Sequence, residues 1–273
     1  GHMGDKIRTM QNLEIIKTEK TSERTLSIVY DLGLKQGKTV IVVGDGPGFY
    51  TTRILAPFMD EAALVCLEGM EFSKLDSIMQ KFGYPVGPIT LIDEVGIDVA
   101  YHVSYDLGEA LGKRVSSGDP KMLEELMKSG ILGRKTKKGF YQYKKKSFFD
   151  KMMSKPKEVN PGTLKILAKY KKDQNQTDGF STSEKRLTYR MLNEALYCLQ
   201  EGILGSPRDG DIGAVFGLGF PPIFGGPFRY VDTYGPNKLL DELKRFRDRY
   251  GERFQPAQIL VDMVSKGQTF YRY

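Results

Sequence analysis

Few side chains in this sequence could act as a general base near neutral pH. Its 273 residues include two histidines and two cysteines. His102 lies inside an amphipathic helical pattern, and His2 belongs to Gly1-His2-Met3, which is typical of a cleaved expression tag. We therefore expect His102 to be a packing or surface residue.

The two cysteines, Cys66 and Cys198, each lie in an apolar stretch with helical spacing. Such positions support neither a disulfide framework nor a cysteine-rich metal site, so we expect no metal ion.

A glycine-rich loop follows a short β-branched run. Residues 39–43 predict a strand, Gly44-Asp45-Gly46-Pro47-Gly48 ends it, and a helical pattern follows. Dinucleotide-binding loops share this order, but Pro47 lacks an amide N–H and the third glycine comes too early for G-x-G-x-x-G. A second strand with an acidic end is also missing about twenty residues later. We therefore assign no cofactor-binding residue to this chain.

An internal repeat organises the rest of the sequence. The segment from Glu61 to Gly69 recurs from Glu194 to Gly202, and Asp76, Gly87-Pro88, Asp93 and Gly96 recur in order as Asp211, Gly226-Pro227, Asp232 and Gly235. Each copy continues into an amphipathic pattern, at 99–111 and at 239–246. Such order over more than forty residues indicates two copies of one helical unit.

The predicted fold is therefore mainly α, with two repeated helical domains and a short β-strand remnant at the N-terminus. We expect a tag remnant at 1–3, an N-terminal segment at 4–47, a first helical repeat at 48–143, a basic linker at 144–182 and a second repeat at 183–273. Composition agrees, because 40% apolar residues suffice for a globular core and no run reaches the eighteen apolar residues of a membrane helix.

The net charge of +7 comes from one segment. Thirteen lysines and one arginine lie between Arg134 and Lys172 against two acidic residues, so the rest of the chain is net acidic. Confined basicity of this kind is typical of a solvated linker and does not predict a nucleic-acid partner. Docking to an acidic partner or to an anionic membrane surface is the alternative.

Several longer motifs resemble a known family. Asp45-Gly46-Pro47-Gly48-Phe49-Tyr50-Thr51-Thr52-Arg53, Phe82-Gly83-Tyr84-Pro85-Val86-Gly87-Pro88 and the closing Gly139-Phe140-Tyr141 are similar to the C-terminal domain of L-3-hydroxyacyl-CoA dehydrogenases. The doubled domain most resembles the α subunits of mitochondrial trifunctional enzymes of fatty acid β-oxidation.

The resemblance implies an enzyme part. Its expected role is to close over substrate and build the interface of an NAD-dependent enzyme that oxidises 3-hydroxyacyl-CoA to 3-ketoacyl-CoA. It implies that the NAD-binding Rossmann domain is missing here and belongs to the full-length protein, so we expect this fragment alone to be inactive and to bind no NAD. The alternative is a non-catalytic, two-repeat binding or scaffold module.

The resemblance also implies two site residues. Met10-Gln11-x-Leu13-Glu14 is similar to the segment carrying the family's glutamate that orients a catalytic histidine, so Glu14 is the candidate catalytic partner of a histidine absent from this chain. An imidazole held by a carboxylate can take the hydroxyl proton as hydride leaves. Thr52 stands where the family has a substrate-binding asparagine, and its hydroxyl can still donate one hydrogen bond.

The implied partners are an acyl-CoA substrate, the missing Rossmann domain, a fused enoyl-CoA hydratase domain and a thiolase β subunit, and the implied location is mitochondrial. Glu14-Ile15-Ile16 is expected to be a strand whose backbone has no partner in this chain. Thr21 or Ser22 is expected to cap the helix that follows.

Overall fold

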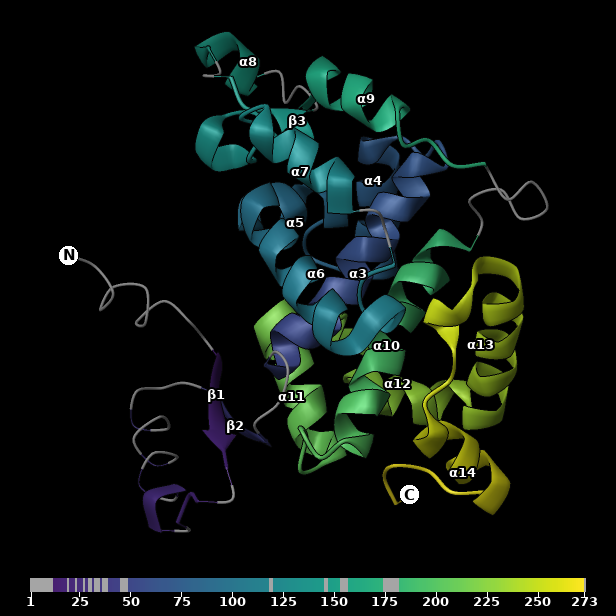
Figure 1. Ribbon diagram of the computed structural model, residues 1–273. Coiled ribbons are helices and arrows are strands. Elements are labelled where there is room, and N and C mark those ends of the chain that lie inside the picture. Colours follow the sequence, from purple (N-terminus) through teal and green to yellow (C-terminus); the bar gives the residue numbers. More distant parts are fainter. Residues whose placement is uncertain are drawn as a thin grey trace. The chain divides into compact units, whose positions relative to one another are not determined.

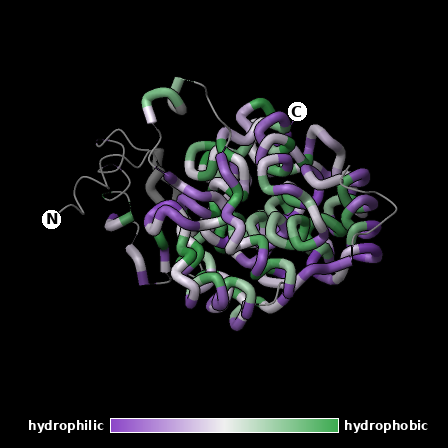
Figure 2. The backbone as a smooth tube through the Cα atoms, turned by 90° about the horizontal axis from the view of Figure 1, so that it is seen from above, coloured by the Kyte–Doolittle hydropathy of each residue, from purple (hydrophilic) through white to green (hydrophobic). Residues whose placement is uncertain are grey.

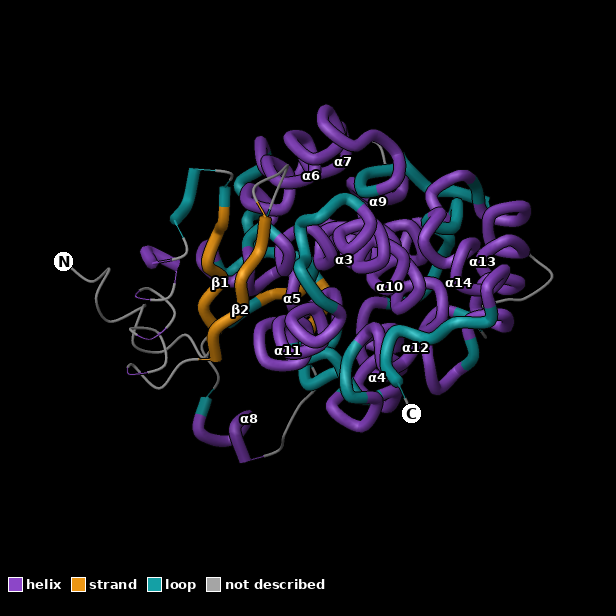
Figure 3. The backbone as a smooth tube through the Cα atoms, turned by 90° about the horizontal axis from the view of Figure 1, so that it is seen from below, coloured by secondary structure: helices purple, strands orange, loops and turns teal. Residues whose placement is uncertain are grey.

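The computed structural model describes residues 12–18, 20–22, 24–26, 28, 31, 35, 39–44, 49–117, 120–144, 147–152, 157–173 and 182–272. The chain forms two compact units. Unit 1 combines Gly1–Leu55 with Tyr189–Tyr273, and unit 2 consists of Ala56–Thr188. Helices dominate both units, with strands confined to short segments (Figures 1 and 3), so the predicted mainly α fold is confirmed.

The first repeat contributes five α-helices. They are α3 (Tyr50–Leu67), α4 (Phe72–Phe82), α5 (Pro88–Val95), α6 (Ile97–Leu111) and α7 (Pro120–Lys128). The first repeat also contains two 3-10 helices, η1 (Gly112–Arg114) and η2 (Arg134–Thr136), and the short strand β3 (Tyr141–Gln142). Hydrophilic and hydrophobic residues are interspersed along the helices of the chain (Figure 2). Leu75, Met79, Ile89 and Ile97 are completely buried in unit 2 and form part of its core.

The second repeat has the same order of helices. They are α10 (Ser183–Gln200), α11 (Pro207–Leu218), α12 (Pro227–Tyr234), α13 (Pro236–Tyr250) and α14 (Gln258–Lys266), with η3 (Pro222–Phe224) and η4 (Glu252–Phe254) between them. Proline opens α5, α12 and α13, where its missing N–H costs no helical hydrogen bond. Within the described residues, no helix is both long and apolar enough to cross a bilayer.

The N-terminal segment contains two strands that pair with each other. β1 (Asn12–Lys17) and β2 (Thr39–Gly44) run parallel with Glu14 opposite Ile41, and both contact α11 in unit 1. The expectation that the Glu14 strand lacks a backbone partner in this chain is therefore wrong. After β1, the Ser22 hydroxyl accepts a hydrogen bond from the Thr25 amide at 3.1 Å, which confirms Ser22 as the cap of the next helical segment.

A buried aspartate in each repeat holds the start of a later helix. Asp76 accepts hydrogen bonds from the amides of Ile89 and Thr90 in the first turn of α5, at 2.8 and 3.1 Å. Asp211 accepts the equivalent bonds from Phe228 and Arg229 in α12, at 2.7 and 3.3 Å. These amides have no partner within their own helix, so the aspartate satisfies them and complements the helix dipole.

The second repeated aspartate holds the closing Phe-Tyr segment. Asp93 accepts from the amides of Phe140 and Tyr141 at 2.8 and 3.1 Å. Asp232 accepts from the amides of Phe270 and Tyr271 at 2.8 and 2.9 Å. The closing tyrosines then donate their hydroxyls to the first aspartates, Tyr141 to Asp76 and Tyr271 to Asp211. The repeated motif thus forms one hydrogen-bonded network per repeat.

Two arginines join the repeats through buried ion pairs. In unit 1, Arg53 Nε lies 2.8 Å from Glu194, and the same guanidinium contacts Glu201. In unit 2, Arg186 lies 2.9 Å from Glu61 and 2.7 Å from Glu68. The residues correspond by repeat position, so each repeat sends one arginine to the glutamate pair of the other.

The Arg53–Glu194 and Arg186–Glu61 pairs are deeply buried. Arg53 and Glu61 are 0% exposed and Arg186 is 2% exposed. Burial lowers the pKa of Arg186, but Glu61 and Glu68 outweigh that effect and hold the pKa above its ordinary value. The boundary between the two units falls within α3 and within α10. Arg53 lies in the first part of α3, and Arg186 lies in the first part of α10.

Part of the basic segment is folded. It contains α8 (Phe148–Met152), β4 (Glu158–Val159), which pairs with β3, and α9 (Pro161–Ala168). The side chains of Asn160 and Thr163 donate to the Gly139 carbonyl at 3.1 and 2.6 Å, and the Lys172 amide donates to Leu67 at 2.9 Å. This differs from the solvated linker expected over 144–182, because Ile166 and Leu167 bury apolar surface that the many lysines obscure in the composition.

The close approach of backbone to Asp93 makes one glycine indispensable. A Cβ on Gly139 would lie 2.1 Å from Asp93 Oδ1, whereas a Cβ on Gly205 would meet nothing within 4 Å. We predict that Gly139→Ala lowers the free energy of unfolding by about 1–3 kcal/mol, because Asp93 must move off its amides. Urea denaturation measures this, with Gly205→Ala as the matched control. Equal stability of the two variants would contradict the prediction.

The Arg186 pairs should respond far more strongly to substitution than a surface pair. We predict that Arg186→Met destabilises the chain by about 3–5 kcal/mol, because Glu61 is left buried without its counter-charge. Lys128→Met is the control, since Lys128 pairs with Glu124 in solvent and should cost less than about 1 kcal/mol. Chemical denaturation of both variants gives the comparison, and similar losses would show that burial does not govern the pair.

Candidate functional site

Thr52 lies in the anchored first turn of α3. Its side chain is exposed, while its neighbours Tyr50 and Arg53 are completely buried. The Tyr50 hydroxyl donates to the Gly210 carbonyl of α11 at 2.8 Å, and Arg53 pairs with Glu194 and Glu201. The turn is thus fixed on its buried side and presents the Thr52 hydroxyl to solvent, where it can donate or accept one hydrogen bond.

Glu14 lies at the centre of β1, opposite Ile41 of β2. The position of its side chain falls outside the described residues, so only its backbone is placed. Both β1 and β2 contact α11, and α11 also receives the Tyr50 hydrogen bond. One helix of unit 1 therefore supports the strand that carries Glu14 and the turn that carries Thr52.

The other residues singled out by the sequence do not form a catalytic set. His102 is exposed on α6 and its ring meets Tyr101 at 5.3 Å, as expected for a surface histidine. Cys66 and Cys198 are buried and form no disulfide, and burial raises the pKa of Cys66 well above its ordinary value, which makes it unreactive. His2 and residues 45–48 of the glycine loop lie outside the described part of the chain. Where the chain is described, no three histidine, cysteine or acidic side chains could hold a metal ion.

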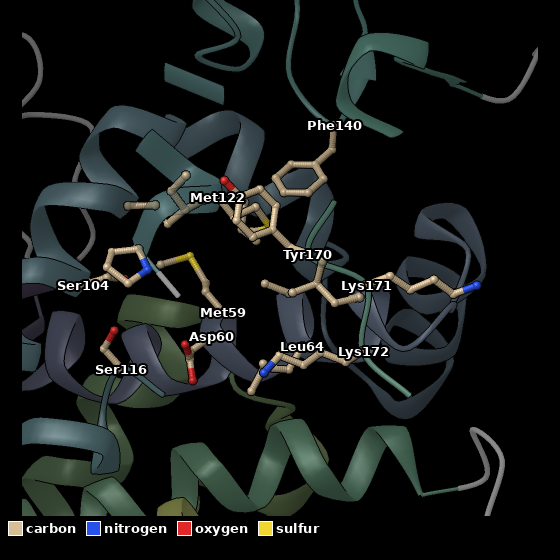
Figure 4. A pocket seen from close by; sticks show the side chains of 16 residues that line it. Met59, Asp60, Leu64, Ser104, Ser116, Met122, Phe140, Tyr170, Lys171 and Lys172 are labelled. Atoms are coloured by element: carbon tan, nitrogen blue, oxygen red, sulfur yellow. The ribbon is translucent and has the colours of Figure 1, made fainter. Parts of the chain in front are cut away.

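Unit 2 contains an apolar cavity that the sequence did not predict. Its volume is about 320 Å³, and Figure 4 shows Phe140, Met122 and Tyr170 close together along it. Polar groups also reach it from Asp60 and Ser116, but Asp60 already accepts from the amide and hydroxyl of Ser117 at 3.2 and 2.6 Å. The cavity has the apolar lining of a small-molecule pocket. The cavity can hold an apolar group. The Asp60 carboxylate that reaches it already accepts hydrogen bonds from Ser117.

The cavity is assembled from parts that are distant in sequence. Its lining comes from α3, α5, α6, α7, the closing Phe140 and residues 170–172 of the basic segment. Residues 170–172 are brought there by the folded part of that segment, in which the Tyr170 hydroxyl donates to Glu125 at 2.7 Å. No single sequence motif could have indicated such a pocket.

Asp211 follows Gly210 on α11, the residue whose carbonyl accepts the Tyr50 hydrogen bond. Burial raises the pKa of Asp211 to about 6, although hydrogen bonds from Tyr271 and from the amides of Phe228 and Arg229 favour its ionised form. Burial likewise raises the pKa of Asp93 in unit 2. Both aspartates are recognisable in the sequence as repeated residues, but the sequence does not indicate that they accept hydrogen bonds from backbone amides.

Comparison with known proteins identifies a single family. Residues 48–143 and 179–271 match the family described as 3-hydroxyacyl-CoA dehydrogenase, C-terminal domain. The fatty acid oxidation complex subunit alpha of Shewanella loihica is 45% identical over 270 residues, which cover 99% of this chain and 36% of that protein. The corresponding subunit of Vibrio parahaemolyticus is 44% identical over 270 residues, with 99% and 36% coverage. The chain thus spans little more than a third of these relatives.

Solved structures share the fold. The 3-hydroxybutyryl-CoA dehydrogenase of Escherichia coli K12 superposes with a TM-score of 0.73 at 22% identity, covering 95% of this chain and 69% of that one. The dehydrogenase part of multifunctional enzyme 1 from C. elegans gives a TM-score of 0.66 at 25% identity, covering 93% and 56%. The resemblance to this family and to multifunctional α subunits is confirmed.

The comparisons correct one expectation. The relatives named above come from Shewanella and Vibrio, which are bacteria and have no mitochondria. The predicted mitochondrial location is therefore wrong.

The raised pKa of Asp211 predicts a pH dependence of stability. Because the folded pKa of about 6 exceeds the ordinary 3.8, the folded state retains a proton that the unfolded chain loses as the pH rises from about 4 to 6. The contribution of this group to the free energy of unfolding should fall by roughly 3 kcal/mol over that range. Urea denaturation at several pH values measures it. The Asp211→Asn variant cannot ionise at this position and should lack this pH-dependent component. Parallel profiles of unfolding free energy against pH for the variant and the unaltered protein would refute the prediction.

Proposed function

Because the chain belongs to the 3-hydroxyacyl-CoA dehydrogenase C-terminal domain family, we propose that it is the substrate-closing and interface part of a longer NAD-dependent enzyme. That enzyme would oxidise the 3-hydroxyl of an acyl-CoA to a ketone, as part of fatty acid β-oxidation. The observation that carries the proposal is the family match over both repeats, together with the Glu14 strand and the Thr52 turn on one helix.

The described residues do not fit NAD by themselves. Before α3 they comprise the β1–β2 pair and a helical segment that follows Ser22, and the sequence after Gly44 contains Pro47, which has no amide N–H to offer a phosphate. In the proposed enzyme, a separate domain would bind NAD, which supplies the hydride acceptor. No step of the mechanism is therefore assigned to NAD contacts in this chain.

Glu14 would act through a histidine of the longer protein. Its carboxylate would accept the ring N–H of that histidine, fix the tautomer and stabilise the imidazolium formed when the hydroxyl proton is taken. Thr52 would hydrogen-bond the reacting end of the substrate, where its hydroxyl replaces the amide of relatives. In this scheme, Arg53 and Tyr50 hold the Thr52 turn in place.

The proposed partners follow from the same assignment. They are an acyl-CoA substrate, the NAD-binding domain, a fused enoyl-CoA hydratase domain and a thiolase β subunit. The names of the relatives, which describe a complex with an alpha subunit, support a multifunctional assembly of this kind.

We predict that Glu14→Gln in the full-length protein lowers kcat for 3-hydroxyacyl-CoA oxidation by at least about a hundredfold. Glutamine keeps the shape but cannot stabilise the imidazolium. Steady-state NADH formation measures this, and KM should change little. Glu71→Gln is the control, because Glu71 is exposed and makes no side-chain cap hydrogen bond. Unchanged kcat in the Glu14 variant would contradict the role proposed for Glu14, and no activity in the parent protein would favour the non-catalytic scaffold.

A further inference from the structure

The apolar cavity of unit 2, which we call the unit 2 cavity, has a buried part and an exposed part. All of its lining residues lie between positions 59 and 172, so one compact unit builds it. In its buried part the wall includes Ile92, Met122 and Phe140, which are 3%, 4% and 0% exposed. Side chains of this kind favour an apolar group over water.

The exposed part of the lining carries positive charge. Pro120, Lys171 and Lys172 line the cavity and are exposed to solvent. The neighbouring Lys169 pairs with Glu125, but the ammonium groups of Lys171 and Lys172 have no carboxylate partner among the described residues. A ligand could therefore enter on this side and meet a cation there.

The two lysines point in different directions. In Figure 4 the Lys172 side chain runs beside Leu64 with its nitrogen on the side of Asp60, whereas Lys171 points away from the cavity. Asp60 is the one acidic residue of the lining, and its carboxylate accepts hydrogen bonds from the amide and hydroxyl of Ser117 at 3.2 and 2.6 Å. Lys172 is thus the charged group that remains for a ligand, and it attracts an anion.

The volume of the cavity limits the size of the apolar part of a ligand. A protein cavity of about 150 Å³ holds one benzene molecule, which has six carbons. The unit 2 cavity, at about 320 Å³, therefore holds on the order of ten to twelve carbons. A compact polar ligand such as a sugar or an inorganic anion would leave the apolar wall unused, and a neutral hydrocarbon would leave Lys172 unused.

We propose that the unit 2 cavity binds the carboxylate of a free fatty acid with about eight to twelve carbons. The chain lies against Ile92, Met122 and Phe140, and the carboxylate pairs with the Lys172 ammonium on the exposed side. Binding is non-covalent and reversible. The site stands independently of the dehydrogenase proposal, since neither Glu14 nor Thr52 belongs to its lining.

Titration calorimetry with ten-carbon probes, used below the concentrations at which they form micelles, tests the head group. Decanoate should bind this chain about fivefold more tightly than decanol and at least tenfold more tightly than decyltrimethylammonium, because Lys172 attracts only an anion. A series of chain lengths tests the cavity. The Kd should fall by about tenfold for every two carbons from hexanoate to decanoate. Beyond about twelve carbons it should change little, because the cavity is then full.

Matched variants locate the ligand. Lys172→Gln should weaken decanoate binding about fivefold and leave decanol binding unchanged. Lys171→Gln is the control, because it removes the same charge from a neighbour that points away. Ala63→Phe fills the cavity from α3 and should weaken the binding of both probes at least twentyfold, whereas Val99→Phe, at a 42% exposed position on α6, should leave both unchanged. Circular dichroism would show that each variant keeps its helices.

Four results would overturn the proposal. The first is no binding of decanoate, or equal binding of decanoate and decanol. The second is decanoate binding that a folded Ala63→Phe variant retains. The third is an equal loss of decanoate binding in the Lys171→Gln and Lys172→Gln variants. The fourth is decanoyl-CoA binding at least tenfold tighter than decanoate and lost in Ala63→Phe, which would assign the cavity to the acyl chain of a thioester.

Discussion

The hydrogen bonds accepted by two aspartates hold each repeat together. Asp76 and Asp211 fix the starts of α5 and α12, and Asp93 and Asp232 fix the closing Phe-Tyr segments. Each carboxylate satisfies amides that the secondary structure leaves without partners. Because the closing tyrosine also donates to the first aspartate, the early and late parts of a repeat depend on each other.

Other features of the sequence follow from that constraint. A Cβ on Gly87 would lie 2.3 Å from Asp76, and one on Gly226 would lie 2.4 Å from Asp211. The Gly-Pro steps are therefore needed for two reasons, since glycine lets the aspartate approach and proline opens the helix. A motif that identifies the family is thus explained by packing around a carboxylate.

The sequence predicted local features well. Helical periodicity located α3, α6 and α13, and the β-branched run located β2, because these patterns depend on neighbouring residues. Pairing of β1 with β2 was missed because the partner strand lies more than twenty residues away. The fold of α9 was missed because the lysines of the surrounding segment dominate its composition. Arg186 was overlooked although its spacing from Glu194 equals that of Arg53 from Glu61.

The candidate site depended on resemblance more than on local pattern. An exposed threonine and a glutamate in a strand carry no chemical signal of their own, so Glu14 and Thr52 were found only through the motifs around them. The apolar cavity was not found, because separate parts of the chain contribute to its wall. Local periodicity reports which side of a helix is apolar, and it does not report whether the space beside that helix is filled.

The reciprocal arginine pairs also bear on how a two-repeat chain could arise. Arg53 of one repeat meets glutamates of the other, and Arg186 returns the same contact. Two separate copies of a single-repeat ancestor could make both contacts by exchanging their arginines. Duplication within one gene turns that exchange into an intramolecular one, so the anchored ends of α3 and α10 no longer depend on protein concentration. The two copies are then free to diverge, and one can present an exposed turn while the other serves as its support.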